Sequence, residues 1–278
     1  MLRQHGRSQH WSVQVAPGED EAAAHISHLR SKLLARSDTV AIPDLKHANA
    51  RAGGTASSDV VPTLEVSWKR LTEGSSTTEW SGRVLYRAAA AVGARSAVEI
   101  GSATGLGSCW IASAVARNGG TTLICLDGAS TLLAATSDHV SAIAGFRPST
   151  REGVFARTVS ALSDELPDES IDLVFVDGEH FYEPTMRDAG LLIPKVREGG
   201  IVVFDDISWN DEMERAWLDV SRRVDCAESV EPRHRGSRRL GLFIKGPRGK
   251  GAIRVVDDAF GPAQFWATAR ALKRRLRL

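Results

Sequence analysis

Residues 97–116, AVEIGSATGLGSCWIASAVA, join an apolar, strand-like run to a glycine-rich turn and then to an apolar segment that can form a helix. Gly101, Gly105 and Gly107 occupy the turn, and the acidic Glu99 stands two residues before it. Glycine permits positive φ and a close approach of the backbone to a ligand, and the helix that follows presents free N–H groups. The stretch therefore predicts a ligand cradle. Its glycine spacing alone fits either a nicotinamide dinucleotide or a nucleoside without phosphates.

Apolar runs alternate with helix-like segments of roughly ten to twenty residues from about Val84 onward, a pattern typical of a parallel sheet wrapped by helices. Further strand candidates are RRLGLFIK (238–245) and, more weakly, VDCAESVE (224–231). We expect an α/β, Rossmann-like doubly wound fold with a seven-stranded, mostly parallel sheet and helices on both faces. The five strand candidates that come before these two in the chain are SAVEI (96–100), TTLICLD (121–127), VFARTVS (154–160), IDLVFVD (171–177) and GIVVFDD (200–206).

Both ends of the chain differ from this regular part. A helix is expected from about Glu19 to Arg36, followed by the small, polar run HANARAGGTASSD (47–59), which predicts a loop or linker. We therefore predict an N-terminal extension over residues 1–62 and a main domain over residues 63–278. The tail FWATARALKRRLRL (265–278) carries five positive charges and no acid, and it predicts a solvated C-terminal helix.

The overall composition excludes several classes of partner. The chain has 278 residues with 42% apolar residues, and 35 basic against 34 acidic side chains give a formal charge of +1. Such a balance gives no global field for nucleic acid or a membrane. Three cysteines without a CxxC pair indicate neither a disulfide framework nor a zinc site. We expect a soluble, cytoplasmic protein that acts on a small molecule and forms a homo-oligomer.

A nicotinamide enzyme is disfavoured by the absence of a catalytic pair. Short-chain dehydrogenases have the same glycine spacing but also need tyrosine and lysine as YxxxK. Tyr86 is followed by RAAA and Tyr182 by EPTM, so neither tyrosine has a lysine at the fourth position. The glycine turn must then serve a different cofactor.

A second acid, Asp127, ends the next predicted strand after the pattern ExGxxxG of Glu99–Gly105. A carboxylate at that place accepts two hydrogen bonds from a vicinal diol. The combination resembles the class I S-adenosylmethionine-dependent methyltransferases, in which the turn approaches the methionine half of the cofactor and the acid holds the ribose. The resemblance implies these cofactor-binding residues: Glu99, Gly101, Ser102, Gly105, Asp127, Ser160 and Ala161.

Two of these residues depend on where the third strand lies. Ser160 and Ala161 are assigned to the adenine because they follow the predicted strand VFARTVS. Ser160 also has a structural interpretation as the N-cap of a helix that starts at ALSDEL, and the two roles are compatible.

Acidic side chains end two further predicted strands. Asp177 begins DGEHFYE (177–183), and Asp205 and Asp206 end GIVVFDD. Three carboxylates at one edge of a sheet repel one another, and a bound cation relieves this; oxygen ligands select Mg²⁺, Mn²⁺ or Ca²⁺ rather than zinc. The alternative for the aspartate pair is a cap on the helix expected near Asp211. A divalent metal site at Asp177, Asp205 and Asp206 is the preferred hypothesis.

The same motifs, from about Ser75 to Lys245, resemble the metal-dependent O-methyltransferases, namely the catechol type and a related group with VDGxHxYE and a DD pair that often tailors natural products. Where the catechol enzymes have a lysine as general base, this chain has His180, which is competent near neutral pH. A structural histidine is the alternative. The chain also departs from the catechol pattern in having Asp-Asp instead of Asp-Asn.

These residues predict S-adenosylmethionine-dependent O-methylation of a vicinal diol or catechol-like hydroxyl, with Asp177 and His180 in the catalytic roles. Trp209 and Tyr182 are expected to line the acceptor pocket, and core packing is the alternative for each. Trp80 is expected to close over the site. The alternatives in function are a metal-independent methyltransferase and a methyltransferase-fold binding protein without catalysis.

Overall fold

The central sheet is built from the strands that carry these motifs. In the computed structural model the described residues are 10–12, 15–44, 63–223, 228–230, 239–246 and 252–254. Neighbouring strands follow the order β6-β5-β4-β7-β8-β10-β9. Their bounds are Ser96–Ile100 (β4), Thr122–Asp127 (β5), Ser149–Glu152 (β6), Ile171–Val176 (β7), Val196–Phe204 (β8), Glu228–Val230 (β9) and Leu240–Ile244 (β10).

The sheet is doubly wound around β4. Strands β6, β5, β4, β7 and β8 are parallel, and β10 is antiparallel to β8 and to the three-residue edge strand β9. After β4 the chain adds β5 and β6 on one side and then returns to add β7 and β8 on the other. Ligands bind such sheets at this switch point, outside the carboxyl ends of the strands. The expected doubly wound, mostly parallel sheet is confirmed.

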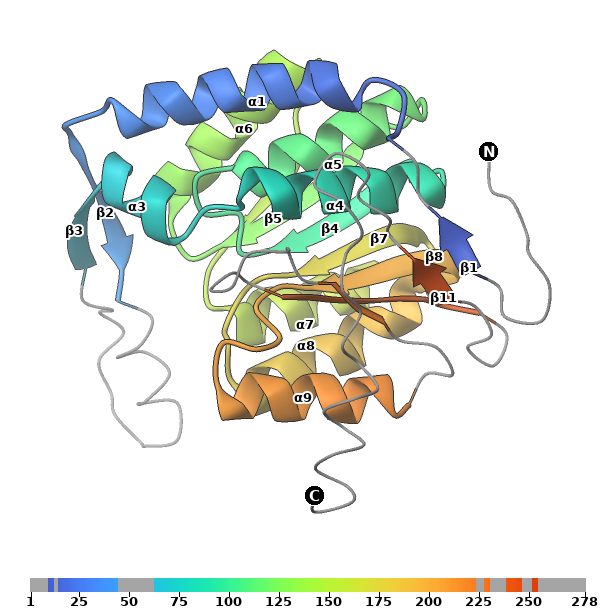
Figure 1. Ribbon diagram of the computed structural model, residues 1–278. Coiled ribbons are helices and arrows are strands. Elements are labelled where there is room, and N and C mark those ends of the chain that lie inside the picture. The colour runs from blue at the N-terminus through green and yellow to red at the C-terminus, as the bar shows by residue number, and fades with distance from the viewer. Residues whose placement is uncertain are drawn as a thin grey trace, which may run out of the picture.

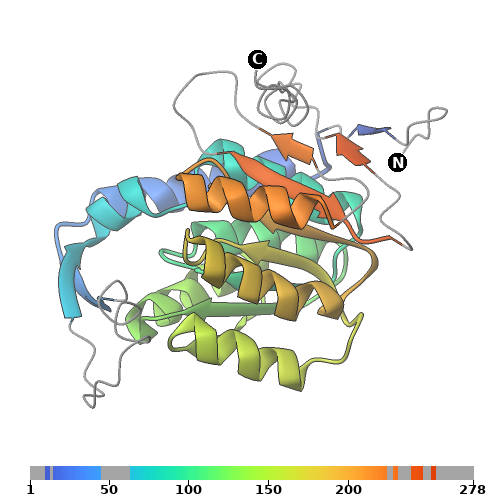
Figure 2. The ribbon, with the colours of Figure 1, turned by 90° about the horizontal axis from the view of Figure 1, so that it is seen from below.

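Two layers of helices cover the sheet (Figure 1). One layer contains α1 (Glu19–Leu34), α4 (Glu79–Ala91), α5 (Leu106–Arg117) and α6 (Ser130–Ala144). The opposite layer contains α7 (Phe155–Glu165), α8 (Tyr182–Leu192) and α9 (Asp211–Ser221), which Figure 2 shows in front. The remaining elements are β1 (His10–Ser12), β2 (Thr39–Pro43), β3 (Thr63–Ser67), α3 (Trp68–Gly74), the 3₁₀ turn η1 (Ile193–Lys195) and β11 (Ala252–Arg254).

The strands divide their side chains between two hydrophobic clusters, one on each face of the sheet. Ala97 and Cys125 pack into the cluster under α4 and α5, whereas Val98 and Ile124 pack into the cluster under α7 to α9. This alternation follows from the period of two along a strand. Burial on both faces explains why the strands appear in the sequence as continuous apolar runs. It also directs Glu99 toward the layer that contains α5.

Helix α1 packs into the same core as the main domain. Ala22, Ile26 and Leu33 are buried in the cluster that contains α4 and α5. At the start of α1, the fully buried Glu19 carboxylate accepts hydrogen bonds from Arg87 Nε at 2.7 Å and Nη2 at 2.9 Å. The boundary between residues 62 and 63 stays a prediction, and the helix expected in the extension is confirmed.

The third strand of the prediction is wrong. VFARTVS lies mostly in α7. Counting along the chain, the third strand of the central sheet is β6, which pairs with β5. Phe155, Val159 and Leu162 are buried at helical spacing, which explains the error because a short window of such a pattern also suits a strand. Strand β6 was missed because it is short, polar and half-exposed.

Other predicted segments lie outside the described residues, namely the linker 47–59 and the basic C-terminal segment 265–278. Within the described part of the chain, no helix is long and apolar enough to cross a membrane. Homo-oligomerisation and the cytoplasmic location stay predictions.

Candidate functional site

The glycine turn lies directly against the segment that begins with Asp177. Gly101 and Gly105 have φ of +87° and +80°, and Ala103 between them has φ of +45°, which is uncommon for a residue with a side chain. A Cβ on Gly101 would lie 2.0 Å from the carbonyl oxygen of Asp177. Only glycine fits there, so the turn and the DGEH segment form one continuous edge.

Asp127 holds the turn in shape from the neighbouring strand β5. Its Oδ2 accepts a hydrogen bond from the N–H of Ala103 at 2.8 Å, and its Oδ1 accepts one from Ala129 at 3.1 Å. Burial raises the pKa of this carboxyl, and the backbone N–H groups oppose the shift. A carboxylate has about four lone-pair sites, so capacity remains for ribose hydroxyls. The structure therefore brings Asp127 to the turn as the sequence predicted.

Glu99 lies beneath the first turn of α5 and is 1% exposed. Its Oε2 accepts a hydrogen bond from the Ser108 hydroxyl, and burial raises the pKa of the carboxyl to about 8. A Cβ on Gly107 would lie 2.6 Å from both Glu99 Oε1 and Thr77 Oγ1. Gly107 thus allows α5, Glu99 and Thr77 to meet.

Thr77 was missed by the sequence reasoning. It is 6% exposed and precedes Thr78, the N-cap of α4, so the packing of α4 against α5 brings it to the cradle. The run SSTTE gives no signal for this, because only the tertiary packing places Thr77 there.

Replacement of Glu99 by glutamine is expected to flatten the dependence of stability on pH. Because the pKa of about 8 in the folded protein exceeds the ordinary value of 4.5, the folded protein keeps a proton that the unfolded chain releases. This contribution is complete below pH 4.5 and is lost as the pH rises toward 8. Its size is on the order of a few kcal/mol. Urea unfolding between pH 4.5 and 8 measures the slope, with Glu73→Gln, an exposed site on α3, as control; an unchanged slope in Glu99→Gln contradicts the assignment.

A buried hydroxyl in the turn supports a bound ligand. Ser102 is 4% exposed, and its Oγ has no hydrogen-bond partner among the described residues. A buried polar atom without a partner is costly, and a ligand atom would remove that cost. Together with the N–H groups at the start of α5, the turn fits a polar, phosphate-free ligand end. Gly101, Ser102, Gly105 and Asp127 are brought together here.

Ser160 and Ala161 do not follow a strand. Both lie in the middle of α7, where Ser160 is half-buried and Ala161 is exposed, so the premise that assigned them to the adenine is wrong. The residues that follow β6 are Gly153 and Val154, and the N–H of Gly153 donates to the carbonyl oxygen of Asp127. The contact of Ser160 and Ala161 with an adenine stays a prediction.

His180 stands between two carboxylates. Its Nε2 lies 3.6 Å from Asp177 Oδ1 and 3.6 Å from Asp206 Oδ2. Asp206 has φ of +50°, a strained conformation of the kind that clusters at functional sites. An imidazole nitrogen in this place can accept a proton from a hydroxyl, and the two carboxylates would face the positive charge that forms. The sequence predicted that Asp177, Asp205 and Asp206 converge, and the structure brings Asp177 and Asp206 to His180.

The third carboxylate of the predicted metal site is arranged differently. Asp205 is completely buried, and its Oδ1 accepts a hydrogen bond from the N–H of Asp206 at 2.9 Å. Across the described residues no group of three His, Cys, Asp or Glu side chains is placed to hold a metal ion. A three-carboxylate cage is therefore not formed. Mg²⁺ is commonly held by one or two carboxylates together with water and substrate oxygens. Asp177 and Asp206 can still supply two such carboxylates.

An exposed aromatic side chain lies beside His180, and a second one follows it in the chain. Trp209 is 66% exposed and Phe181 is 50% exposed, and the rings of Trp209 and His180 are 6.4 Å apart. Tyr182 instead packs toward α9, where its hydroxyl donates to Asp219 Oδ2 at 2.9 Å. Trp80 is half-buried against the core. Of the predicted aromatic residues, Trp209 is the one that the structure brings to His180, and Phe181 was missed.

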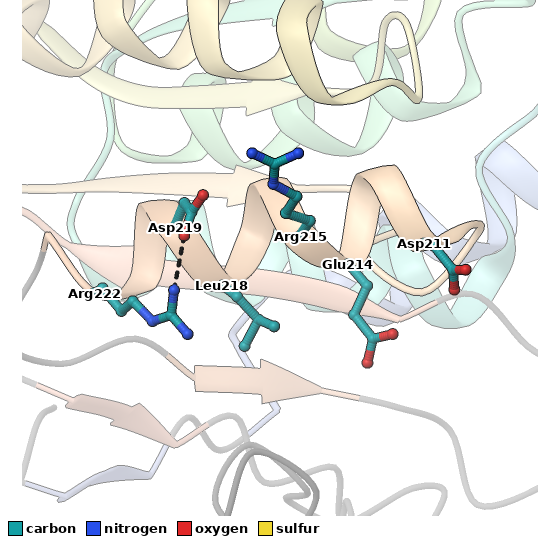
Figure 3. A pocket seen from close by; sticks show the side chains of 6 residues that line it. All are labelled: Asp211, Glu214, Arg215, Leu218, Asp219 and Arg222. Atoms are coloured by element: carbon teal, nitrogen blue, oxygen red, sulfur yellow. Dashed lines mark hydrogen bonds and ion pairs between the residues drawn. The ribbon is translucent and has the colours of Figure 1, made fainter. Parts of the chain in front are cut away.

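A separate pocket lies along α9 (Figure 3). Its lining is formed by Asp211, Glu214, Arg215, Leu218, Asp219 and Arg222. None of these residues belongs to the glycine turn or to the His180 cluster, and Asp219 is already paired with Arg222 and Tyr182. This charged, open surface is not the candidate active site.

Comparisons with known proteins agree with the geometry of the sheet edge. Residues 98–207, from the middle of β4 to just beyond Asp206, match the family described as a methyltransferase domain. This part of the chain is therefore similar to a methyltransferase domain. The glycine turn, Asp127 and the His180 cluster all lie inside the matched residues, whereas α1 and Thr77 lie before them.

The methyltransferase domain also resembles solved structures. TomG, an O-methyltransferase of tomaymycin synthesis from Streptomyces achromogenes solved with SAM, is 20% identical with a TM-score of 0.51, covering 62% of this chain and 82% of its own. A putative O-methyltransferase from Klebsiella pneumoniae is 13% identical with a TM-score of 0.51, and the match covers 84% of this chain and 92% of that protein. A putative caffeoyl-CoA O-methyltransferase from Staphylococcus aureus is 13% identical with a TM-score of 0.50, and the match covers 73% of this chain and 98% of that protein. At these identities the likeness shows the fold alone, which is the Rossmann-like fold of methyltransferases.

A curated relative that matches a short part of this chain gives less information about function. An uncharacterized protein of Acanthamoeba polyphaga mimivirus is 38% identical over 52 residues, which are 19% of this chain and 23% of that protein. The match thus spans about a quarter of the length of the relative. The activity and substrate are therefore argued from the site itself.

Proposed function

We propose that the protein transfers a methyl group from S-adenosylmethionine to a hydroxyl oxygen of a small molecule. The observation that carries this proposal is the contact between Gly101 and Asp177, which joins the cofactor cradle to the His180 cluster. TomG, with a similar fold, is an O-methyltransferase solved with SAM, and this supports the same cofactor here.

The cofactor would be bound by the glycine turn and the groups around it. Asp127 has the capacity to accept hydrogen bonds from the ribose, and Ser102 Oγ is available to the methionine half. The adenine would then lie beside the residues that follow β6, because Gly153 is bonded to the carbonyl of Asp127. Glu99 and Thr77 would support the turn from below rather than carry the chemistry.

Methyl transfer is a displacement at carbon. The acceptor oxygen attacks the methyl group, a C–O bond forms, the C–S bond breaks, and the sulfur keeps the electron pair to give S-adenosylhomocysteine. The acceptor proton goes to His180 Nε2, and the carboxylates of Asp177 and Asp206 stabilise the imidazolium that forms. Positioning of the two reactants contributes the rest of the rate enhancement.

A divalent cation is the finer part of the proposal. Asp177 and Asp206 would hold it, with water and acceptor oxygens completing the coordination. When bound, Mg²⁺ would orient two adjacent acceptor oxygens and lower the pKa of the attacking hydroxyl. Asp205 would contribute by fixing the backbone of Asp206.

The acceptor class follows from the exposed aromatic residues. In the described part of the chain four large apolar side chains are exposed, and one of them, Trp209, has its ring 6.4 Å from the ring of His180. An exposed aromatic face beside a base suits a flat acceptor that stacks on it. A catechol-like ring fits this arrangement better than an aliphatic diol, and its origin in natural product biosynthesis remains the prediction made from the motifs.

Trp209→Ala is expected to raise the KM for a catechol acceptor roughly threefold to tenfold, because stacking contributes about 0.5–1.5 kcal/mol. The affinity for S-adenosylhomocysteine should not change. Steady-state kinetics with catechol measures the effect. Trp209→Phe keeps an aromatic face and should retain most of the affinity, and Val15→Ala, another exposed apolar site, serves as control. Equal KM values for Trp209→Ala and the unmodified protein would remove Trp209 from the acceptor site.

Two measurements test the proposed function itself. Calorimetric titration with S-adenosylhomocysteine should show saturable binding, and the absence of binding overturns the proposal in favour of a non-catalytic protein. Transfer of a labelled methyl group to catechol, phenol and vicinal-diol sugars, with and without EDTA, then identifies the acceptor. Transfer that EDTA does not affect would favour the metal-independent alternative.

A further inference from the structure

Asn210 makes two hydrogen bonds that lead in opposite directions. It is the N-cap of α9, and its Oδ1 accepts a hydrogen bond from the N–H of Met213 at 2.8 Å. Its Nδ2 donates to the carbonyl oxygen of His180, also at 2.8 Å. The partners fix the orientation of the amide, because one is a donor and the other an acceptor. A cap alone needs only the acceptor.

The second bond closes a ring of contacts around the candidate base. The N–H of Trp209 donates to the carbonyl oxygen of Asp206, so Asp206 and Asn210 belong to one short turn. Asp206 faces the ring of His180 at 3.6 Å, while Asn210 holds the backbone of the same residue. The distance between imidazole and carboxylate thus depends on both ends of this turn.

Neighbouring contacts do not replace this bond. Glu212 Oε2 accepts a hydrogen bond from the N–H of Tyr182, and Thr185 Oγ1 donates to the carbonyl of Glu179. These bonds hold the residues on either side of His180 and Phe181. At His180 itself, the side chain of Asn210 donates to the backbone carbonyl.

We propose that Asn210 is a positioning residue that sets His180 relative to Asp206, in addition to capping α9. Asparagine is needed at this position because it combines an acceptor for the helix with a donor for the His180 carbonyl. The catalytic consequence rests on the proposed function, whereas the effect on the His180 backbone does not.

Asn210→Asp separates the two roles. Aspartate caps as well as asparagine does, but it turns a carboxylate oxygen toward the His180 carbonyl. Asn210→Ser also keeps the cap but is too short to bridge. We expect both variants to stay folded with Tm within about 3 °C of the unmodified protein. Ser67→Ala, which removes the cap of α3, is the control for loss of a helix cap away from this site.

Amide hydrogen exchange of the apo-protein tests the positioning directly. In Asn210→Asp the peptide that covers residues 178–183 should exchange faster, and the peptides of β4 and β7 should not. Unchanged exchange in residues 178–183 overturns the inference. This measurement needs no substrate, so its outcome is independent of whether the protein methylates anything.

Kinetics with catechol tests the catalytic consequence. The kcat of Asn210→Asp should fall roughly tenfold to a hundredfold while the KM for S-adenosylmethionine is kept, as expected for a misplaced catalytic group. In a His180→Ala background the same substitution should have little further effect, because it acts through His180. Full additivity of the two substitutions contradicts the inference. No turnover in the unmodified protein would instead count against the proposed function.

Discussion

We expect His180→Ala to lower kcat by roughly 100- to 10,000-fold, because this is the range that a general base contributes to the rate. The affinity for S-adenosylhomocysteine should stay the same, because the imidazole faces Asp177 and Asp206 rather than the glycine turn. Turnover of catechol and calorimetric titration with S-adenosylhomocysteine measure the two quantities.

The control for this variant is His25→Ala, which removes an exposed imidazole from α1. A kcat of His180→Ala within about twofold of the control would assign His180 to a structural role. Its backbone contact with Asn210 is kept in the alanine variant, so a large loss reports on the ring.

Asp177→Asn is expected to abolish the response to Mg²⁺ and to lower turnover at least about 100-fold, since it removes one of the two charged oxygen ligands that we propose for the metal. Cofactor binding should persist, because the carbonyl of Asp177 that lies against Gly101 is kept in the variant. Turnover is measured after EDTA treatment and again with added Mg²⁺.

The same substitution at Asp211, an exposed acid at the start of α9, is the matched control for charge. His180→Ala should retain the response to Mg²⁺ at a lower rate, which separates the two roles. An Asp177→Asn protein that Mg²⁺ still activates would contradict the metal assignment.

The sequence predicts the cradle and the His180 cluster well for a physical reason. Strands buried on both faces are continuous apolar runs, and whatever follows them must emerge at one edge of the sheet. Gly101, Asp127, Asp177 and Asp206 all follow from this rule. The rule does not find β6, because this edge strand is polar. The apolar pattern predicts the third strand at VFARTVS instead, so Ser160 and Ala161 are expected to follow a strand although they lie in α7.

Other features depend on packing between segments far apart in sequence. Thr77 reaches Glu99 only because α4 packs on α5, and the motifs contain no sign of it. Asp205 and Asp206 look equivalent in sequence and both are buried. Asp206, which has a positive φ, lies 3.6 Å from His180, whereas Asp205 accepts a hydrogen bond from the N–H of Asp206. Single-residue backbone conformations of this kind are set by the surrounding structure.

The paired charges of Glu19 and Arg87 have a consequence for how the protein can be divided. Arg83 reaches the same carboxylate at 2.9 Å, so the first residue of α1 neutralises guanidinium groups of α4 inside the core. A fragment that starts at residue 63 would keep Arg87, 1% exposed in the whole protein, without this counter-charge. The fragment would also lose the apolar contacts that Ile26 and Leu33 of α1 make with this core, so it should be less stable than the whole chain. A minimal methyltransferase made from this chain must therefore begin before Glu19.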